Sequence, residues 1–215
     1  MKESHALVIG ATGATGRELV KYLLHNPLIS KVSIFVRRDL DLKHQKLTVH
    51  KIDFNKLNEY ENLINGDVLF SVLGTTLKEA GDKKKQFLVD YIYQYNFALI
   101  ASKNGINHYS LVSTIGANNK SFLFYPRMKG QLEEAVKKLS FNSIHIFQPP
   151  SLIRQSDLIR NGEKIIISII SIFNKFGILI SLKPVLVKDL AKKIIYEFQQ
   201  ENIKKLIIFK PEDIQ

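Results

Sequence analysis

Hydrophobic positions along the chain fall into short apolar runs that alternate with segments of helical periodicity. The apolar runs, each short enough for one buried strand, occupy residues 5–10, 31–36, 46–52, 67–74, 108–113, 143–147 and 205–209. Helical signals mark residues 15–25, 57–64, 86–104, 127–139 and 188–200. Regular alternation of strand and helix predicts right-handed crossovers and a parallel sheet with helices on both faces, which is a doubly wound α/β fold.

The alternation is interrupted over residues 151–186. We therefore expect a single domain over 1–215 with a small annex on the substrate side at about 151–186. Within the annex, residues 165–182 are strongly apolar, but the longest stretch without strongly polar residues is Ile165–Phe173, far short of the roughly 20 residues that span a bilayer. No transmembrane segment is expected. A buried helix, the wall of a substrate cleft or an oligomer contact is favoured over a membrane-surface helix.

A glycine-rich loop connects the first predicted strand to the first predicted helix. In this context the first glycine permits a tight turn, the second lets a pyrophosphate approach the backbone, and the third lets the helix pack closely on the strand. The helix N-terminus adds N–H groups and a partial positive charge. The loop predicts a Rossmann-like dinucleotide-binding domain whose phosphate-binding residues are Gly10, Thr12, Gly13, Ala14, Thr15 and Gly16.

The end of the second predicted strand distinguishes the two nicotinamide dinucleotides. An acidic residue there would bind the ribose 2′-hydroxyl of NAD, whereas arginine suits the 2′-phosphate of NADP. The chain places Arg37 and Arg38 there, ahead of Asp39, so we expect NADP rather than NAD. After the third strand, Asp53 and Phe54 are candidates for the adenine; Asp53 has an equally good interpretation as a helix N-cap.

The formal net charge of +11 raises the question of nucleic-acid binding. The basic residues are spread along the chain, with one short cluster at 83–85, and no recognisable nucleic-acid-binding motif accompanies them. We therefore expect a solvated lysine-rich surface that partly attracts a phosphorylated ligand, and no nucleic-acid partner.

Cysteine and histidine usage excludes further classes of site. The chain contains no cysteine, so disulfides, cysteine nucleophiles and cysteine metal sites are excluded. Its 6 histidines are scattered without a pair at ligand spacing, and we expect no metal site. Because the glycine loop begins by residue 10, a secretory signal peptide has no room, and we expect a cytoplasmic protein.

Several segments in combination resemble one known family. The atypical short-chain dehydrogenases/reductases, in particular the Tat-interacting oxidoreductase-like proteins and their bacterial relatives, have similar motifs. The matching segments are the G-x-x-G-x-x-G loop, Arg37-Arg38, "LGTTLKEAG" (73–81), "SLVSTIGAN" (110–118) and "YPRMKGQLEEAVKKL" (125–139). The resemblance covers about residues 5–155 and is weaker beyond.

The resemblance implies a catalytic group. The chemistry of that superfamily rests on a Tyr-x-x-x-Lys pair with an upstream Ser or Thr, and Tyr125 and Lys129 match the pair on one helix face. A tyrosine with a pKa of about 10 is a poor proton donor and acceptor at neutral pH, and a nearby ammonium lowers that pKa. Lys129 would also bind the nicotinamide ribose. Ser113, or its neighbour Thr114, would orient and polarise the substrate carbonyl; we favour Ser113.

Other family positions map onto the ends of the fourth and sixth strands. Leu73, Gly74 and Thr75 would run past the ribose and phosphates of the cofactor. Gln148 and Pro149 stand where the family has an Arg-Pro-Gly turn near the nicotinamide, and Pro150 replaces the glycine, which removes a backbone N–H. The superfamily's helix asparagine has two candidate counterparts, Asp90 and Asn96.

Two functions follow from the sequence. The leading hypothesis is an NADP-dependent oxidoreductase that transfers hydride between NADP(H) and a small, apolar carbonyl or alcohol. The alternative is an NADPH-binding regulatory or interaction protein with little or no catalysis, which the altered turn at 148–150 and the short annex fit. The sequence allows a homodimer without specifying one.

Overall fold

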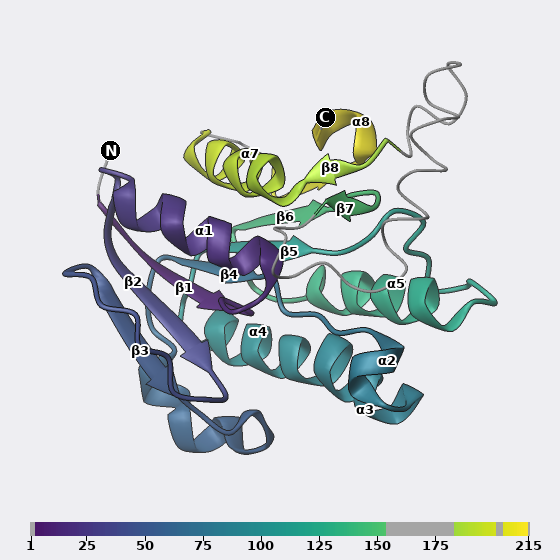
Figure 1. Ribbon diagram of the computed structural model, residues 1–215, viewed down its shortest axis with the longest axis horizontal. Helices are drawn as coiled ribbons and strands as arrows, with labels where there is room; N and C mark the ends of the chain where they lie inside the picture. The colour runs from purple at the N-terminus through teal and green to yellow at the C-terminus, as the bar shows by residue number, and fades with distance from the viewer. Residues whose placement is uncertain (1–2, 154–182, 201–203, 215) are drawn as a thin grey trace.

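The computed structural model describes residues 3–153, 183–200 and 204–214 (Figure 1). The expected annex, except for its ends, and the apolar segment 165–182 lie outside the described residues. A short parallel pair, β7 (Leu152–Ile153) and β8 (Val185–Leu186), is what the structure describes of the annex.

A parallel sheet organises the described residues, in the order β3-β2-β1-β4-β5-β6-β9. Every neighbouring pair is parallel, as the alternation predicts. Its strands are β1 (Ser4–Ile9), β2 (Ile29–Val36), β3 (Leu47–Lys51), β4 (Val68–Ser71), β5 (His108–Val112), β6 (Ser143–Phe147) and β9 (Leu206–Phe209).

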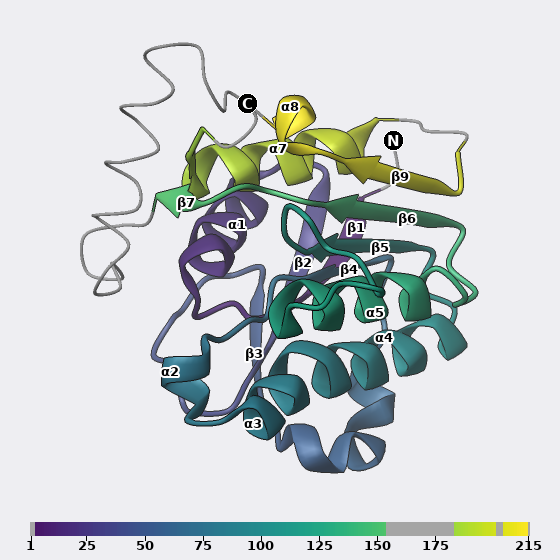
Figure 2. The same cartoon turned by 90° about the vertical axis from the view of Figure 1, so that its right-hand side faces the viewer.

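Helices cover both faces of this sheet (Figures 1 and 2). One face carries α1 (Ala14–His25), α7 (Val187–Gln199) and α8 (Pro211–Ile214). The other carries η1 (Phe54–Leu63), α4 (Gln94–Lys103) and α5 (Phe124–Val136). The short helices α2 (Leu77–Ala80) and α3 (Lys83–Phe87) and the π-helical turn η2 (Leu88–Tyr93) connect β4 to α4. The prediction of a Rossmann-like doubly wound fold is confirmed.

The two faces of the sheet divide the core into two layers. Because successive strand residues point to opposite faces, Leu7 and Ile9 pack with α4 and α5, whereas Ala6 and Val8 pack with α1 and α7. All four of these side chains are fully buried. The unbroken apolar runs of the sequence thus reflect strands that are covered on both sides.

Three helical segments differ in detail from the prediction. The expected helix at 57–64 is a 3₁₀ helix that begins at Phe54, and the helix expected at 127–139 begins earlier, at Phe124. The helix expected at 86–104 contains the π turn η2. Buried polar groups fix this turn: the Gln94 side chain donates to the Asp90 carbonyl at 2.7 Å and accepts from Ser71 Oγ at 2.8 Å.

Helix α5 lies directly against the loop that leads into it. A Cβ at Gly130 would come within 2.6 Å of the Asn118 backbone nitrogen and closer still to the Asn118–Asn119 peptide bond. Position 130 must therefore lack a side chain, because the backbone atoms of the loop cannot move aside as a flexible side chain can.

We expect Gly130→Ala to lower the free energy of unfolding by about 1–3 kcal/mol, although alanine is the better helix former. Urea denaturation monitored by circular dichroism measures this value. The neighbouring exposed substitution Gln131→Ala is the control and should change stability by less than about 0.5 kcal/mol. Equal stability of Gly130→Ala and the parent would contradict the packing shown.

Two histidines, the buried His145 and the half-buried His108, lie side by side on the α7 face of the sheet. The rings of His108 and His145 are 4.4 Å apart, with Phe198 against His108 and Phe209 against His145. Burial lowers the pKa of His108 to about 3 and that of His145 to about 4. Both imidazoles are therefore neutral in the folded protein near pH 7.

The folded protein should lose stability as the pH falls from 6.5 towards 4. Over this range the unfolded chain protonates these histidines while the folded chain does not, so the unfolded state gains protons and is favoured. At pH 5 His145 alone accounts for about 2 kcal/mol. Denaturation of His145→Phe at pH 8 and pH 5 should show a smaller difference between the two conditions than the parent shows; an unchanged difference would refute the assignment.

Candidate functional site

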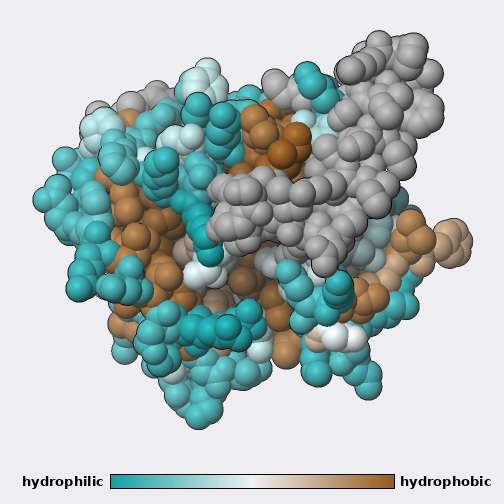
Figure 3. Space-filling model, viewed as in Figure 1, coloured by the Kyte–Doolittle hydropathy of each residue, from teal (hydrophilic) through white to brown (hydrophobic). Residues whose placement is uncertain are grey.

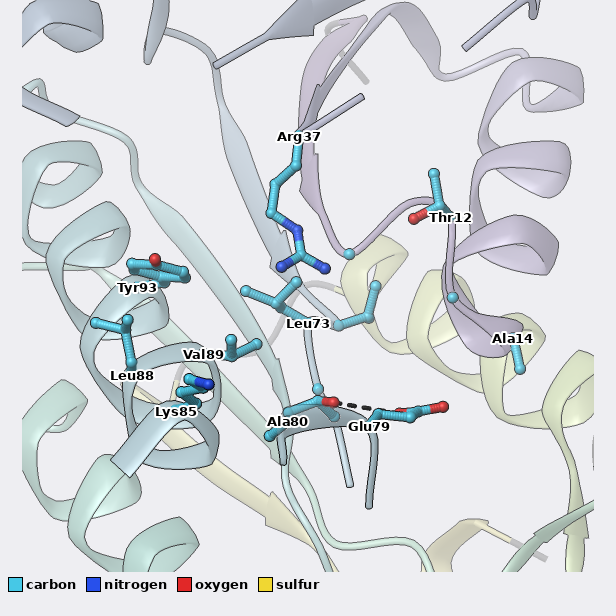
Figure 4. Close-up of a pocket in the computed structure, with 15 residues that line it drawn as sticks. Thr12, Ala14, Arg37, Leu73, Glu79, Ala80, Lys85, Leu88, Val89 and Tyr93 are labelled. Atoms are coloured by element: carbon cyan, nitrogen blue, oxygen red, sulfur yellow. Dashed lines mark hydrogen bonds between the residues drawn. The ribbon is translucent and has the colours of Figure 1, made fainter. Parts of the chain in front are cut away.

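A cavity of about 510 Å³ opens at the carboxyl ends of β1 and β4. The strand order reverses between these two strands, and ligands of doubly wound folds bind in the crevice at that point. Figure 4 shows the residues around it. The lining consists of Gly10, Thr12, Gly13, Ala14, Arg37, Val72, Leu73, Gly74, Thr75, Glu79, Ala80, Lys85, Leu88, Val89 and Tyr93.

The floor of the cavity is a close backbone contact between the glycine loop and the end of β4. Gly10 has φ +87°, and a Cβ there would lie 2.5 Å from Leu73 N. A side chain at Gly16 would collide with the carbonyl oxygen of Gly10, so the first turn of α1 lies against the loop. The first and third glycines thus have the roles that the sequence predicts.

The N-terminus of α1 faces this cavity. Gly13 is its N-cap, offers no side-chain cap, and donates its own N–H to the Gly10 carbonyl at 3.0 Å. Arg17 Nε holds the loop by donating to the Thr12 carbonyl at 3.2 Å. No acidic residue stands in the first turn of the helix, so no side chain there offsets the positive end of the helix dipole, which favours an anion such as a phosphate. Thr15, also predicted to bind phosphate, is buried in the first turn of α1 and is not among the described residues that line the cavity.

Arg37 extends towards Leu73, between Thr12 and Tyr93 (Figure 4). It also lines a smaller adjoining pocket of about 40 Å³ that contains Phe54. Arg38 is exposed and is not among the described residues that line either cavity. Asp39 pairs with Lys51 Nζ at 2.6 Å, a hydrogen bond that lowers the pKa of this carboxyl. The Asp39 carboxylate, the acidic group that could bind a ribose hydroxyl, is thus paired with Lys51.

Asp53 serves as a helix cap. Its Oδ1 accepts hydrogen bonds from the backbone N–H and the side-chain amide of Asn55, both at 2.9 Å, and the first of these lowers the pKa of the carboxyl. Asp53 does not line the cavities formed by the described residues, whereas its neighbour Phe54 does. The structure therefore shows Asp53 as a helix cap and places Phe54 at the smaller pocket.

The segment after β4 supplies two charged lining residues, Glu79 and Lys85, that were not predicted as site residues from the sequence. Thr76 and Glu79 form a capping box that starts α2, and Asp82 caps α3 just before Lys85. The T-x-x-E pattern is the signal that could have located the first of them. The predicted residues Leu73, Gly74 and Thr75 all line the cavity.

A second polar group lies where β5, β6 and α5 meet. Ser113 Oγ donates to Glu133 Oε1 at 2.5 Å, and Gln148 Nε2 donates to both Glu133 oxygens at 3.0 Å. Glu133 is 4% exposed. The sequence analysis missed Glu133, although its position four residues after Lys129 places it on the same helix face.

Lys129 is buried beside this carboxylate. Its ammonium donates to the Val112 carbonyl at 3.3 Å. Burial lowers the pKa of Lys129, whereas the negative charges of Asp90 and Glu133 raise it. Two carboxylates thus face the buried lysine and partly offset the effect of burial on its pKa.

Tyr125 lies in the first turn of α5, one turn before Lys129, and is 38% exposed. Ser113 is buried against α5, whereas its neighbour Thr114 starts a turn by accepting from Ala117 N–H at 3.2 Å. The geometry therefore favours Ser113 over Thr114 as the partner of this helix. Ser113, Tyr125 and Lys129 are not among the described residues that line the large cavity.

The remaining candidates are also located. Asp90 is buried and accepts from Thr75 N–H at 2.9 Å, whereas Asn96 is exposed on α4. Of the two candidates, Asp90 is the one whose charge raises the pKa of Lys129. The Pro149 carbonyl accepts from Ile115 N–H at 2.9 Å, which fixes the turn that contains the unusual Pro150.

Two searches gave negative results within the described part of the chain. No group of three or more histidine, aspartate or glutamate residues there is placed to hold a metal ion. None of the helices described is long and apolar enough to cross a membrane.

Comparisons with known proteins agree with this architecture. The model of the NAD(P)H-binding family matches residues 10–145. Rat HTATIP2 is 34% identical over 168 residues, which cover 76% of this chain and 69% of the relative. The mitochondrial FMP52 protein of Candida albicans is 32% identical over 202 residues, covering 91% and 88%.

Solved structures show the same fold at low identity. WbmH from Bordetella bronchiseptica in complex with NAD⁺ superimposes with a TM-score of 0.71 at 16% identity, covering 98% of this chain and 75% of that one. A UDP-N-acetylglucosamine 4-epimerase from Methanobrevibacter ruminantium gives 0.71 at 17% identity, covering 98% and 77%. With the glycine loop, the cavity and these relatives in view, the chain belongs to the NAD(P)H-binding family of atypical short-chain dehydrogenases/reductases.

Proposed function

We propose that the protein is an NADP-dependent oxidoreductase that transfers hydride between NADP(H) and a small, apolar carbonyl or alcohol. The observation that carries this proposal is the buried group of Ser113, Lys129 and Glu133 at the end of β5, on the same edge of the sheet as the dinucleotide cavity. NADP(H), when bound, supplies or accepts the hydride. The residues of the chain would hold the dinucleotide and manage the proton.

The preference for NADP rests on Arg37. Arg37 is the arginine that lines both cavities among the described residues, and it offers the forked donors that match a phosphate. Asp39 is paired with Lys51 and would not compete for a ribose hydroxyl. The structural neighbours solved with NAD share at most 16% sequence identity with this chain. They therefore support the fold and not the choice of dinucleotide.

Tyr125 would donate the proton in reduction and accept it in oxidation. The Lys129 ammonium, one turn along α5, would stabilise the phenolate and so bring the pKa of the phenol towards neutrality. Burial lowers the pKa of Lys129, and the negative charges of Asp90 and Glu133 partly offset this effect. The same carboxylates limit how strongly Lys129 acts on Tyr125.

The hydrogen bond of Ser113 favours a role other than the one the sequence suggested. A hydroxyl has one proton, and Ser113 donates it to Glu133. Its oxygen therefore presents lone pairs to the site, which suits accepting a hydrogen bond from a substrate alcohol or from the Tyr125 phenol. In this arrangement Ser113 orients the reacting groups and does not polarise a carbonyl by donating to it.

The alternative function, an NADPH-binding regulatory or interaction protein, has one specific observation in its favour. The polar groups at the end of β5 are hydrogen-bonded to one another: Glu133 accepts from both Ser113 and Gln148, and Lys129 donates to Val112. A site whose groups are already satisfied can be structural. The turn with Pro150 fits the same interpretation.

Arg37→Ala should weaken NADPH binding about 10–100-fold, because a charge-assisted contact to the 2′-phosphate contributes about 1.5–3 kcal/mol. NADH binding should change by less than about threefold, because NADH lacks that phosphate. Fluorescence titrations of both dinucleotides measure this. Arg38→Ala is the matched control and should have the smaller effect; equal affinity of the unaltered protein for NADPH and NADH would disprove the proposal of NADP specificity.

Tyr125→Phe should reduce turnover about 10²–10⁴-fold while NADPH affinity stays unchanged, because the substitution removes the proton that the reaction needs. A panel of apolar aldehydes and ketones, with NADPH absorbance as the readout, identifies a substrate and measures the loss. Retention of full turnover by Tyr125→Phe would exclude this mechanism. Binding of NADPH without turnover on any member of the panel would favour the regulatory alternative.

A further inference from the structure

The loop that leads into α5 exposes two large apolar side chains. Phe122 is 100% exposed and Leu123 is 70% exposed. Figure 3 shows an apolar protrusion at the edge of the molecule, in the region where this loop projects in Figure 1. Two adjacent side chains of this kind, fully outside the core, are costly in water and indicate a surface that meets another phase or partner. We call Phe122 and Leu123 the apolar tip.

The apolar tip is held by hydrogen bonds on both sides. Before it, Ser121 N–H donates to the Asn118 carbonyl at 3.0 Å, and Leu123 N–H donates to Ser121 Oγ at 3.2 Å. After it, one guanidinium nitrogen of Arg127 donates to the carbonyls of Ser121 and Phe122 at 3.0 and 3.1 Å. The close contact of Gly130 with Asn118 fixes the same loop on α5. The outward position of the tip is therefore built into the fold.

Basic residues surround the apolar tip. Lys120 is exposed two residues before Phe122. Lys83 Nζ lies 5.6 Å from the centre of the ring of Phe124, the residue that follows the tip, and Lys84, next to Lys83 on α3, is exposed. The acidic groups on these elements have other partners: Asp82 pairs with Lys85, and Glu79 bonds to Thr75 and Thr76.

We infer that the apolar tip and the lysines around it dock the protein on an anionic lipid bilayer. Apolar side chains that insert into the interface, flanked by lysines that meet acidic headgroups, are the two components of peripheral membrane binding. A second copy of the chain fits less well, because a symmetric contact centred on the tip would bring the lysines of both copies together. The net charge of +11 favours the same partner at long range.

Docking by this surface specifies a substrate class for the proposed oxidoreductase, and this step rests on that proposed function. Leu123 precedes Tyr125 by two residues, so the tip would hold the candidate proton donor at the bilayer surface. A lipophilic carbonyl compound or alcohol dissolved in the membrane would then be within reach of α5.

Co-sedimentation of the full chain with vesicles tests the inference. The protein should bind vesicles that contain phosphatidylglycerol, bind pure phosphatidylcholine vesicles much less, and dissociate as salt is raised. Replacing both tip residues, Phe122→Ser with Leu123→Ser, should reduce partitioning about tenfold or more. Lys83→Ser with Lys84→Ser should reduce it about 30-fold at low salt, at about 1 kcal/mol for each lysine.

A matched control uses exposed leucines elsewhere. Leu42→Ser with Leu63→Ser removes two side chains that are each 41% exposed, and vesicle binding should change by less than about twofold. Thermal melting confirms that each variant is folded, and NADPH titration of the tip variant should match the parent.

Absent binding of vesicles by the parent, or equal binding by the tip variant, would overturn the inference. A change of oligomeric state without a change in vesicle binding would assign the tip to a second copy instead. If the parent protein did not bind NADPH, that result would count against the proposed function and not against docking on the bilayer.

Discussion

Three backbone segments meet at the centre of the molecule with no side chain between them. The end of β1, the first turn of α1 and the end of β4 come together around Gly10, whose space is limited by Val72 and Leu73. The contact fixes where the helix N-terminus points, and hence where an anion can bind. The cavity, the position of Arg37 above it, and the path of the segment after β4 all follow from this contact.

A second constraint operates one strand further along the sheet. Glu133 is buried with hydrogen bonds from the ends of β5 and β6, so the carboxylate joins two strands to α5. An isolated buried carboxylate would be unfavourable, and its donors together with the Lys129 ammonium compensate it. The same arrangement fixes the direction of the Ser113 hydroxyl proton. The hydrogen bonds that stabilise the buried Glu133 are therefore the same ones that orient the Ser113 hydroxyl.

The order of strands and helices and the dinucleotide loop could be predicted from the sequence, because both depend on local patterns: apolar runs, helical spacing and three glycines. The positions of Arg37, Phe54 and Leu73 at the cavity follow from the ends of parallel strands sharing one edge. The π turn at Leu88–Tyr93 could not be predicted, since it depends on a hydrogen bond from Ser71 on another element. Glu133 was missed for a similar reason, because its partners are distant in sequence and glutamate on a helix usually faces solvent.

The packing of α1 against α7 has a consequence for how the protein folds during its synthesis. Helix α1 is synthesised long before α7, yet both seal the same face of the sheet, and the Gln199 side chain donates a hydrogen bond to Asn26. Parallel strands and such distant contacts make folding slow relative to helical bundles. During synthesis, the apolar side of α1 that includes Leu19 and Leu23 stays uncovered by α7 until that helix has emerged. The late covering of this surface follows from the topology and not from any single residue.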